Sequence, residues 1–230
     1  MKTIGLIGGI TWLSTLDYYR YFNELVYKHT NGESTAEVII NSVNYPAIAK
    51  LTAAGKWDEI AVIICNAAVL LEKAGAACVM LGANTMHHIS PQVKEKINIP
   101  FIHIAEETGK EILKKGIKKV GLLGTKYTMQ LSFFKDVLAS QGIETIIPNE
   151  ADVETINEGI YKELALGIIT EQNRRNYLHI MDKLKAERAG GIILGCTEIP
   201  LLIKEIDFDL PLFDTTFIHA NAAVNFSLSI

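Results

Sequence analysis

One pattern occurs four times in the sequence: a run of Ile, Val and Leu that ends in glycine and is followed by hydroxyl or amide residues. The copies form two similar pairs. About 77 residues separate Gly5 from Gly82 in the first pair, and about 74 separate Gly121 from Gly195 in the second. The four segments are residues 2–9, 79–85, 119–125 and 192–198. This internal repeat predicts two similar lobes whose equivalent strand-end loops face each other across a cleft.

Apolar runs alternate with segments whose apolar residues recur every three or four positions, as is typical of parallel strands joined by crossover helices. We therefore predict an α/β fold with two pseudo-symmetric lobes, each a mostly parallel sheet flanked by helices. The N-terminal lobe is expected at 1–103, with 214–230 packing back onto it, and the C-terminal lobe at 104–213. The predicted strands are 3–7, 37–41, 77–81, 101–103, 119–123, 143–147, 191–194 and 211–213. The predicted helices are 15–29, 57–74, 91–97, 105–115, 128–141, 152–166, 171–189 and 215–228.

Composition excludes several classes of protein. The chain has 230 residues, 49% of them hydrophobic and 21% charged, which suits a folded domain with a sizeable core. The net charge is -4 and no basic cluster exceeds a lysine pair, so a nucleic-acid partner is not expected. The longest apolar stretch, 61–71, contains Asn66 and is too short to span a bilayer. The start of the sequence is interpreted as a buried strand and not as a signal peptide.

Three cysteines are too few, and too irregularly spaced, for a disulfide framework or a zinc site. They fit a reducing cytoplasm best. Cys65 lies among apolar helix residues and Cys78 inside a strand, so both are expected in the core. Cys196 follows a buried strand and precedes a helix, where the helix dipole and nearby N–H groups stabilise a thiolate. It could be an acid/base, a nucleophile or simply core filler.

In open α/β sheets ligands bind at the carboxyl ends of the strands, so the candidate loops are 8–15, 82–88, 124–128 and 195–200. Glycine allows close backbone approach there, and helix N-termini can bind a small anion. The first loop does not match the dinucleotide fingerprint and no P-loop motif is present, which disfavours NAD and ATP.

Other polar residues leave alternatives open. His87 and His88 could be a helix-start polar pair or part of a site. His103 follows a strand and is a second candidate, whereas His179 and His219 are expected on helices without a recognisable partner. Trp12 could form a wall of the cleft or cap the core.

Taken together, these loops resemble the aspartate/glutamate racemase family, and in particular its broad-specificity amino-acid racemase branch. The resemblance covers nearly the whole chain, and it depends on several motifs occurring in the correct order. These motifs are Met1-Lys-Thr-Ile-Gly-Leu-Ile-Gly-Gly9, Trp12-x-Ser14-Thr15-x-x-Tyr18-Tyr19, Asn84-Thr85-Met86-His87, Leu123-Gly-Thr125-x-Tyr127-Thr128-Met129, Gly195-Cys-Thr-Glu198, Phe213-Asp214-Thr215 and Ile218-His219-Ala220.

The resemblance implies a cofactor-independent racemase acting on acidic amino acids, a small-molecule amino-acid substrate, and a homodimer. It implies neither a metal nor pyridoxal phosphate. In such enzymes two cysteines, one from each lobe, flank the substrate Cα; one removes the α-proton and the other returns a proton to the opposite face. Backbone and side-chain donors hold the carboxylates and stabilise the carbanion-like transition state.

The sequence departs from this pattern at the first cysteine, where the family motif Cys-Asn-Thr is replaced by Ala83-Asn84-Thr85. Alanine has no exchangeable side-chain proton, so one face of the substrate lacks its acid/base. Three explanations remain: a substitution that silences the enzyme, which we favour; a water or another residue on that face; or one-thiol chemistry. The related arylmalonate decarboxylases resemble the last case, although their aromatic-substrate pocket is not recognisable here.

Carboxylate recognition also departs from the aspartate-specific members. Ile48 and Ala165 align with their arginine and lysine, which argues against strict aspartate specificity. The resemblance places substrate-binding groups at Ile10, Thr52, Asn84, Thr85 and Thr197, beside the catalytic positions Cys196 and Ala83. Lys50, Lys56 and Lys162 are candidates for the missing cation, but each is better interpreted as a solvated lysine.

The leading hypothesis is therefore an amino-acid racemase with Cys196 as one acid/base. The alternatives are a single-cysteine decarboxylase or cis–trans isomerase of small dicarboxylic acids, and a non-catalytic protein that binds an acidic metabolite.

Overall fold

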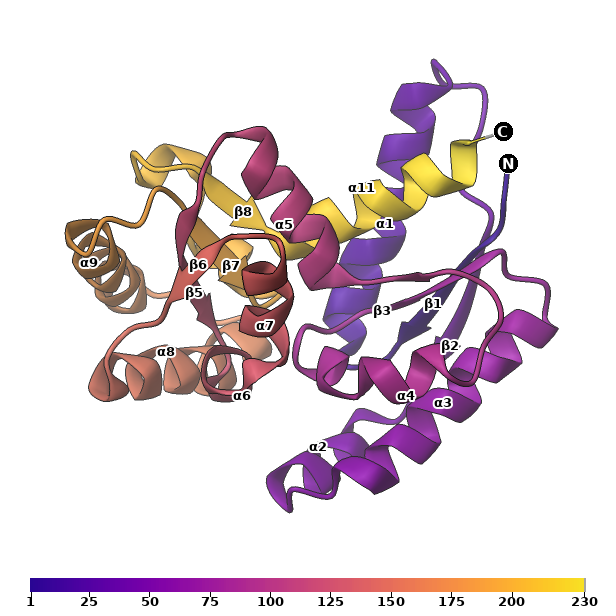
Figure 1. Ribbon diagram of the computed structural model, residues 1–230, viewed down its shortest axis with the longest axis horizontal. Coiled ribbons are helices and arrows are strands. Elements are labelled where there is room, and N and C mark those ends of the chain that lie inside the picture. Colours follow the sequence, from indigo (N-terminus) through magenta and orange to yellow (C-terminus); the bar gives the residue numbers. More distant parts are fainter. Residues whose placement is uncertain (230) are drawn as a thin grey trace. The chain divides into compact units, whose positions relative to one another are not determined.

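The computed structural model describes residues 1–229, and the chain divides into two compact units (Figure 1). Unit 1 comprises 1–104 and 216–230, and unit 2 comprises 105–215. Each unit contains a four-stranded parallel sheet flanked by helices, which confirms the predicted fold class. None of the described helices is both long enough and apolar enough to cross a membrane.

Unit 1 is built on a sheet of strand order β2-β1-β3-β4. Its strands are β1 (Ile4–Gly8), β2 (Val38–Ser42), β3 (Cys78–Leu81) and β4 (Phe101–Ile102). Its helices are α1 (Trp12–His29), α2 (Tyr45–Ala53), α3 (Trp57–Lys73), the 3-10 helix η1 (Thr85–Ile89), α4 (Ser90–Lys94) and α11 (Thr215–Leu228).

Unit 2 has the matching order β6-β5-β7-β8. Its strands are β5 (Lys119–Gly124), β6 (Glu144–Ile146), β7 (Ile192–Gly195) and β8 (Leu212–Asp214). Its helices are α5 (Ile104–Lys114), α6 (Lys126–Gln130), α7 (Ser132–Ser140), α8 (Glu150–Lys162), η2 (Leu164–Leu166), α9 (Glu171–Ala186), α10 (Ile199–Leu202) and η3 (Glu205–Asp207).

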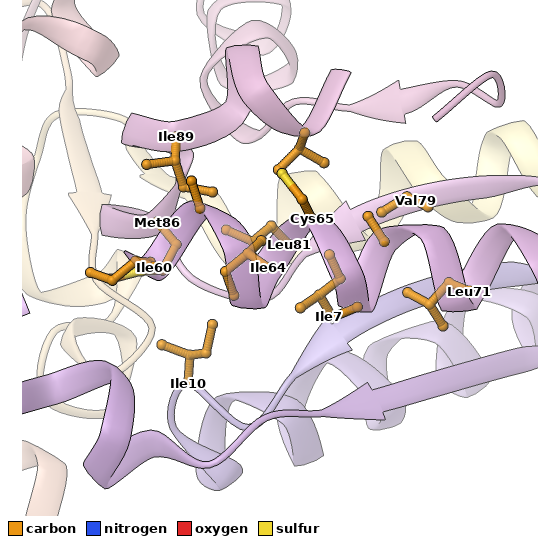
Figure 2. Packing of buried hydrophobic residues seen from close by; sticks show 14 of the residues in the cluster. Ile7, Ile10, Ile60, Ile64, Cys65, Leu71, Val79, Leu81, Met86 and Ile89 are labelled. Atoms are coloured by element: carbon orange, nitrogen blue, oxygen red, sulfur yellow. The ribbon is translucent and has the colours of Figure 1, made fainter. Parts of the chain in front are cut away.

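The sheet of unit 1 is buried on both faces because successive side chains of a strand point to opposite sides. Ile4 and Leu6 of β1 pack in a cluster that includes residues of α1 and α11. Ile7, on the other face, packs in a cluster that contains side chains of α3 and α4 (Figure 2). Cys78 belongs to the first cluster and Cys65 to the second, which confirms that both are core residues.

The two sheets also repeat in register. β1 pairs with β3 so that Ile7 lies opposite Leu81, and β5 pairs with β7 so that Leu123 lies opposite Leu194. The helix that follows the last strand of each sheet belongs to the other unit: α5 follows β4, and α11 follows β8. The internal repeat in the sequence therefore corresponds to a repeated strand order and connectivity.

Glycine is required at the first strand end. Gly9 has a φ of 83°, and a Cβ there would come within 2.2 Å of the Val43 carbonyl oxygen. Only a residue without a side chain fits this turn. The interpretation of Gly8 and Gly9 as a tight strand-to-helix turn therefore accounts for the pair without a ligand.

Several helix boundaries differ from prediction. Helix α1 begins at Trp12 and not at the predicted residue 15, and Thr11 caps it by accepting from the Ser14 N–H at 3.4 Å. The helix expected at 128–141 begins at Lys126 and is interrupted at Leu131, whose backbone is extended, so α6 and α7 are separate. Helix α2 was missed, although Pro46 in its first turn is a start signal. Helix α9 begins at the predicted residue, Glu171, and Thr170 caps it.

Candidate functional site

The turn after β3 carries Ala83, Asn84 and Thr85 in unit 1. Gly82 is held on both sides, because its N–H donates to the Ile7 carbonyl at 2.9 Å and its carbonyl accepts from the Ser14 hydroxyl at 3.2 Å. Ala83 is 9% exposed and belongs to the apolar cluster shown in Figure 2. The turn then continues directly into η1, which begins at Thr85.

The turn after β7 carries Cys196, Thr197 and Glu198 in unit 2. The Cys196 thiol donates to Glu198 Oε2 at 2.9 Å, and the Thr197 hydroxyl donates to the same oxygen at 2.7 Å. Cys196 is 8% exposed and Glu198 is 6% exposed. A buried carboxylate thus accepts two hydrogen bonds from neighbours in its own turn, which offsets part of the cost of burying its charge.

The Cys196 thiol is held in its protonated form. Burial raises its pKa well above the usual value, and the nearby Glu198 carboxylate raises it further, both by repelling a thiolate and by accepting a hydrogen bond from the protonated thiol. The backbone N–H groups of Thr197 and Glu198 act in the opposite direction but are outweighed. The predicted net stabilisation of a thiolate is therefore not found, because burial and the Glu198 carboxylate outweigh these N–H groups.

Register makes the two turns equivalent. Leu81 of β3 lies opposite Ile7 of β1, and Leu194 of β7 lies opposite Leu123 of β5. The residues that follow, Gly82 and Gly195, are therefore equivalent. Counting onward, Ala83 corresponds to Cys196 and Thr85 to Glu198. The same backbone position thus carries a methyl group in unit 1 and a thiol in unit 2.

The other predicted substrate residues of unit 1 lie around the same core. Ile10, Ile48 and Ala83 belong to one apolar cluster, and Ile48 is 1% exposed. Thr52 on α2 is 8% exposed, and its hydroxyl donates to the Ile48 carbonyl at 2.9 Å. The position expected for an arginine in aspartate-specific relatives is therefore apolar and buried.

Two of the lysines that could supply the missing positive charge form ion pairs at the surface. Lys56 pairs with Glu59 at 2.7 Å and Lys162 with Glu158 at 2.8 Å, with well-exposed side chains in both pairs. Their interpretation as solvated lysines is confirmed. Trp12 is 65% exposed and does not cap the core. Among residues 1–229, no group of three His, Cys, Asp or Glu side chains could hold a metal ion.

The structure gives partners to histidines for which the sequence predicted none. His87 is a buried residue of η1 and contacts the Ala83 carbonyl, whereas His88 is partly exposed and packs against the Trp57 ring. His219 has a partner that local sequence could not reveal: its Nδ1 lies 2.9 Å from the Tyr18 hydroxyl.

Sequence reasoning also missed two residues near Cys196. Glu198 lies two positions beyond the cysteine, and this spacing in a Gly-Cys-Thr-Glu turn was an available signal. Tyr177 of α9 is buried and donates to the Ile156 carbonyl at 2.9 Å. Burial raises the pKa of Tyr177, and the charges of Cys196, Glu163 and Glu198 raise it further. No local pattern marked this tyrosine.

Comparison with known proteins identifies the family. A model of the Asp/Glu/hydantoin racemase family matches residues 7–223, and the chain belongs to this family. It is 28% identical over 172 residues to the broad specificity amino-acid racemase RacX of Bacillus subtilis (strain 168), covering 73% of this chain and 72% of that protein.

Solved structures agree with this assignment. A Yersinia pestis protein provisionally named an Asp/Glu racemase has 43% identity and a TM-score of 0.94, with 100% of both chains covered. An aspartate racemase homologue from Pyrococcus horikoshii OT3 has 36% identity and a TM-score of 0.89, again with 100% of both chains covered. Both matches extend over the two repeated sheets.

Proposed function

We propose that this chain exchanges the α-proton of amino acids without a cofactor, with Cys196 as the acid/base for one face of Cα. The observation that carries the proposal is the buried Cys196 thiol, 2.9 Å from Glu198 Oε2 in the turn after β7. A thiol with a carboxylate at hydrogen-bond distance has a partner that can take its proton, which is the requirement for general base catalysis.

Two proton transfers make up this step. The thiol proton passes to Glu198, and the resulting Cys196 thiolate takes the proton from Cα as the C–H bond breaks. The electron pair of that bond stays on the substrate, delocalised into its α-carboxylate. Donors from Asn84, Thr85 and the turn at Thr197 are proposed to bind the substrate and to stabilise the charge that develops.

Ala83 determines what this chain can do with the carbanion. Inversion needs a second group that delivers a proton to the opposite face, and the methyl group of Ala83 has none to give. The chain as it stands is therefore proposed to return a proton mainly to the face it came from. Cysteine at this position would supply the missing acid/base.

The substrate class is proposed to be broader than aspartate alone. Ile48 is buried in the apolar cluster that contains Ala83, and no cation occupies the place where the resemblance implies an arginine. The relative from Bacillus subtilis is named as a broad specificity racemase, which supports this view. Aspartate and glutamate are the first substrates to test because they are the amino acids that the family description names.

The direct test is racemisation by Ala83→Cys. The variant is incubated with each enantiomer of Asp, Glu and a panel of neutral amino acids, and the products are separated by chiral chromatography. We expect inversion of at least one amino acid, abolished by the second change Cys196→Ser. An inert Ala83→Cys protein with a native fold would contradict the proposal.

A second candidate function uses the single thiol as it stands. The Cys196–Glu198 pair and the absence of a proton donor in the Ala83 side chain are compatible with one-sided protonation, as in decarboxylation or cis–trans isomerisation of a small dicarboxylic acid. Carbon dioxide release or double-bond isomerisation with a malonate- or maleate-type diacid would favour this function over racemisation.

A further inference from the structure

Three buried histidines of unit 1 lie in contact behind the turn that carries Ala83. The ring of His87 lies 4.7 Å from that of His103 and 5.6 Å from that of His219, measured between centroids. None of the three is more than 2% exposed. Buried imidazoles are costly unless their ring nitrogens have partners, so the partners reveal what the cluster does.

The partners of His87 define its tautomer. Its Nδ1 lies 2.9 Å from the Ala83 carbonyl oxygen, which can only accept, so Nδ1 carries the proton. Its Nε2 lies 3.3 Å from the Ile104 N–H, which can only donate, so Nε2 carries none. A protonated ring would place a second N–H against that of Ile104. His87 is therefore neutral and joins the Ala83 carbonyl to the Ile104 amide.

The neighbouring histidines hold the same segment of chain. His219 Nε2 donates to the Ile102 carbonyl at 2.8 Å, while its Nδ1 accepts from the Tyr18 hydroxyl. His103 Nε2 lies 3.1 Å from the Ser90 hydroxyl. Residues 102–104 are thus tied by backbone and side chain to η1, to α4 and to α11. This segment is where the chain leaves unit 1, since unit 2 begins at Ala105.

Burial and the neighbouring histidines favour the neutral form of His87, and they outweigh the backbone hydrogen bonds at Ala83 and Asn84, which raise its pKa. Burial lowers the pKa of His87 well below the usual value, and the charges that His103 and His219 would carry lower it further. Burial likewise lowers the pKa of His219, to about 3. The ring therefore keeps one donor and one acceptor across the neutral range, as a fixed link requires.

We propose that His87 is a positioning residue, which holds the Ala83 turn in place by linking the Ala83 carbonyl to the backbone at Ile104. The inference rests on the proposed function, because the turn matters for activity only if it binds the substrate. His87 itself touches no reacting atom in this proposal. Its two ring nitrogens perform separable tasks, and each can be retained without the other.

Two amide substitutions separate these tasks. In His87→Asn the side-chain nitrogen can occupy the place of Nδ1 and still donate to the Ala83 carbonyl. In His87→Gln the side-chain oxygen can reach the place of Nε2 and still accept from the Ile104 N–H. His88→Asn, on the same 3-10 helix but partly exposed, is the matched control.

Activity is measured in the Ala83→Cys background, whose backbone carbonyl is retained. We expect His87→Asn to keep kcat within about threefold and His87→Gln to lower it at least about tenfold with a smaller change in KM, because the turn is misplaced. The control should change neither. Equal losses of kcat in the Asn and Gln variants, matching their losses of thermal stability, would show a merely structural role.

Nuclear magnetic resonance gives a readout that does not depend on turnover. We expect a proton on Nδ1 and none on Nε2 of His87, and faster exchange of the Ile104 amide in His87→Asn than in His87→Gln. The amide signals of residues 83–85 should shift more in His87→Gln. The opposite tautomer, or unchanged turn signals, would overturn the inference. Inactivity of the Ala83→Cys protein with these signals as expected would instead contradict only the proposed function.

Discussion

The turns after β3 and β7 occupy equivalent places in two repeated sheets, yet they carry different chemistry. In unit 2 the turn presents Cys196 with its thiol on the Glu198 carboxylate. In unit 1 the corresponding residue is Ala83, and the ionisable group behind it, His87, contacts the backbone carbonyl instead of a side chain. The strand register and the glycine before each turn fix where the turn lies, whereas the next side chain is a thiol with an exchangeable proton in one unit and a methyl group without one in the other.

The two units also differ in the ionisable groups that they bury. Unit 1 buries three histidines, whose ring nitrogens bind backbone and hydroxyl groups. Unit 2 instead buries a thiol beside a carboxylate, and His179 on α9 is exposed. The two halves of one repeated fold should therefore respond differently to substitution and to pH.

The largest expected effect is loss of the thiol. Cys196→Ser should lower α-proton exchange by about a thousandfold, since a hydroxyl is a far weaker acid/base near neutral pH. Deuterium incorporation at Cα, followed by NMR, measures this rate. Cys65→Ala, which removes another buried thiol from α3, is the control and should leave exchange nearly unchanged. Comparable losses in both variants would remove Cys196 from the chemistry.

Acid should destabilise unit 1 more than unit 2. The pKa of His87 and of His219 is lowered in the folded state, so below about pH 6.5 the unfolded chain binds protons that the folded chain does not. The stability contributed by these two histidines is therefore fully present above that pH and is lost as the pH falls toward their folded-state pKa values. For two such groups the free energy of unfolding falls by about 3 kcal/mol per pH unit.

Hydrogen exchange at pH 7 and pH 5 reports on each unit in one experiment. Amides of β1 and β3 should lose more protection than those of β5 and β7 after correction for intrinsic exchange rates. Replacing His219 by Gln should reduce this pH dependence. An equal loss of protection in both sheets would contradict the assignment of neutral buried histidines to unit 1.

Removing the carboxylate beside the thiol should change the pH profile. Glu198→Gln takes away the negative charge that raises the pKa of Cys196 and offers an amide N–H that can donate to a thiolate, so the thiolate should form at a pH lower by at least about one unit. Ultraviolet absorbance of the thiolate, corrected with Cys196→Ser, follows the titration. A midpoint that does not move would mean that burial alone sets the acidity of this thiol.

The smallest effect concerns the helix caps that the two units share. Thr11 caps α1 and Thr125 caps α6, each accepting from a backbone N–H through its hydroxyl. Thr11→Ala and Thr125→Ala should each lower the free energy of unfolding by about 1 kcal/mol. Denaturant titrations compare them with the serine variants, which keep the cap. A loss in only one unit would show that the two loops are not energetically equivalent.

The sequence predicted the two sheets well because the strands are marked by local patterns. The strands appear as short apolar runs, and the repeat of glycine after each run revealed the two sheets before any contact was known. The interruption at Leu131 was not predictable from periodicity, since the apolar spacing continues through α6 and α7. Helix α2 was overlooked even though Pro46 marked its first turn.

The candidate site was less predictable because it depends on contacts distant in sequence. Cys196 was recognised from its place after a strand, but the sign of its pKa shift depends on where the Glu198 carboxylate points. Tyr18 and His219 are 201 positions apart, and no local pattern links them. Whether the residues at the two turns bind the substrate stays a prediction.

The most direct test of the central claim is α-proton exchange in heavy water by the unsubstituted chain and by Ala83→Cys, with each enantiomer of aspartate and glutamate. We expect the unsubstituted chain to exchange the proton of one enantiomer with little inversion, whereas Ala83→Cys should both exchange and invert. Efficient inversion by the unsubstituted chain would contradict the claim that the Ala83 face lacks an acid/base. Absence of exchange in both proteins would contradict the role assigned to Cys196.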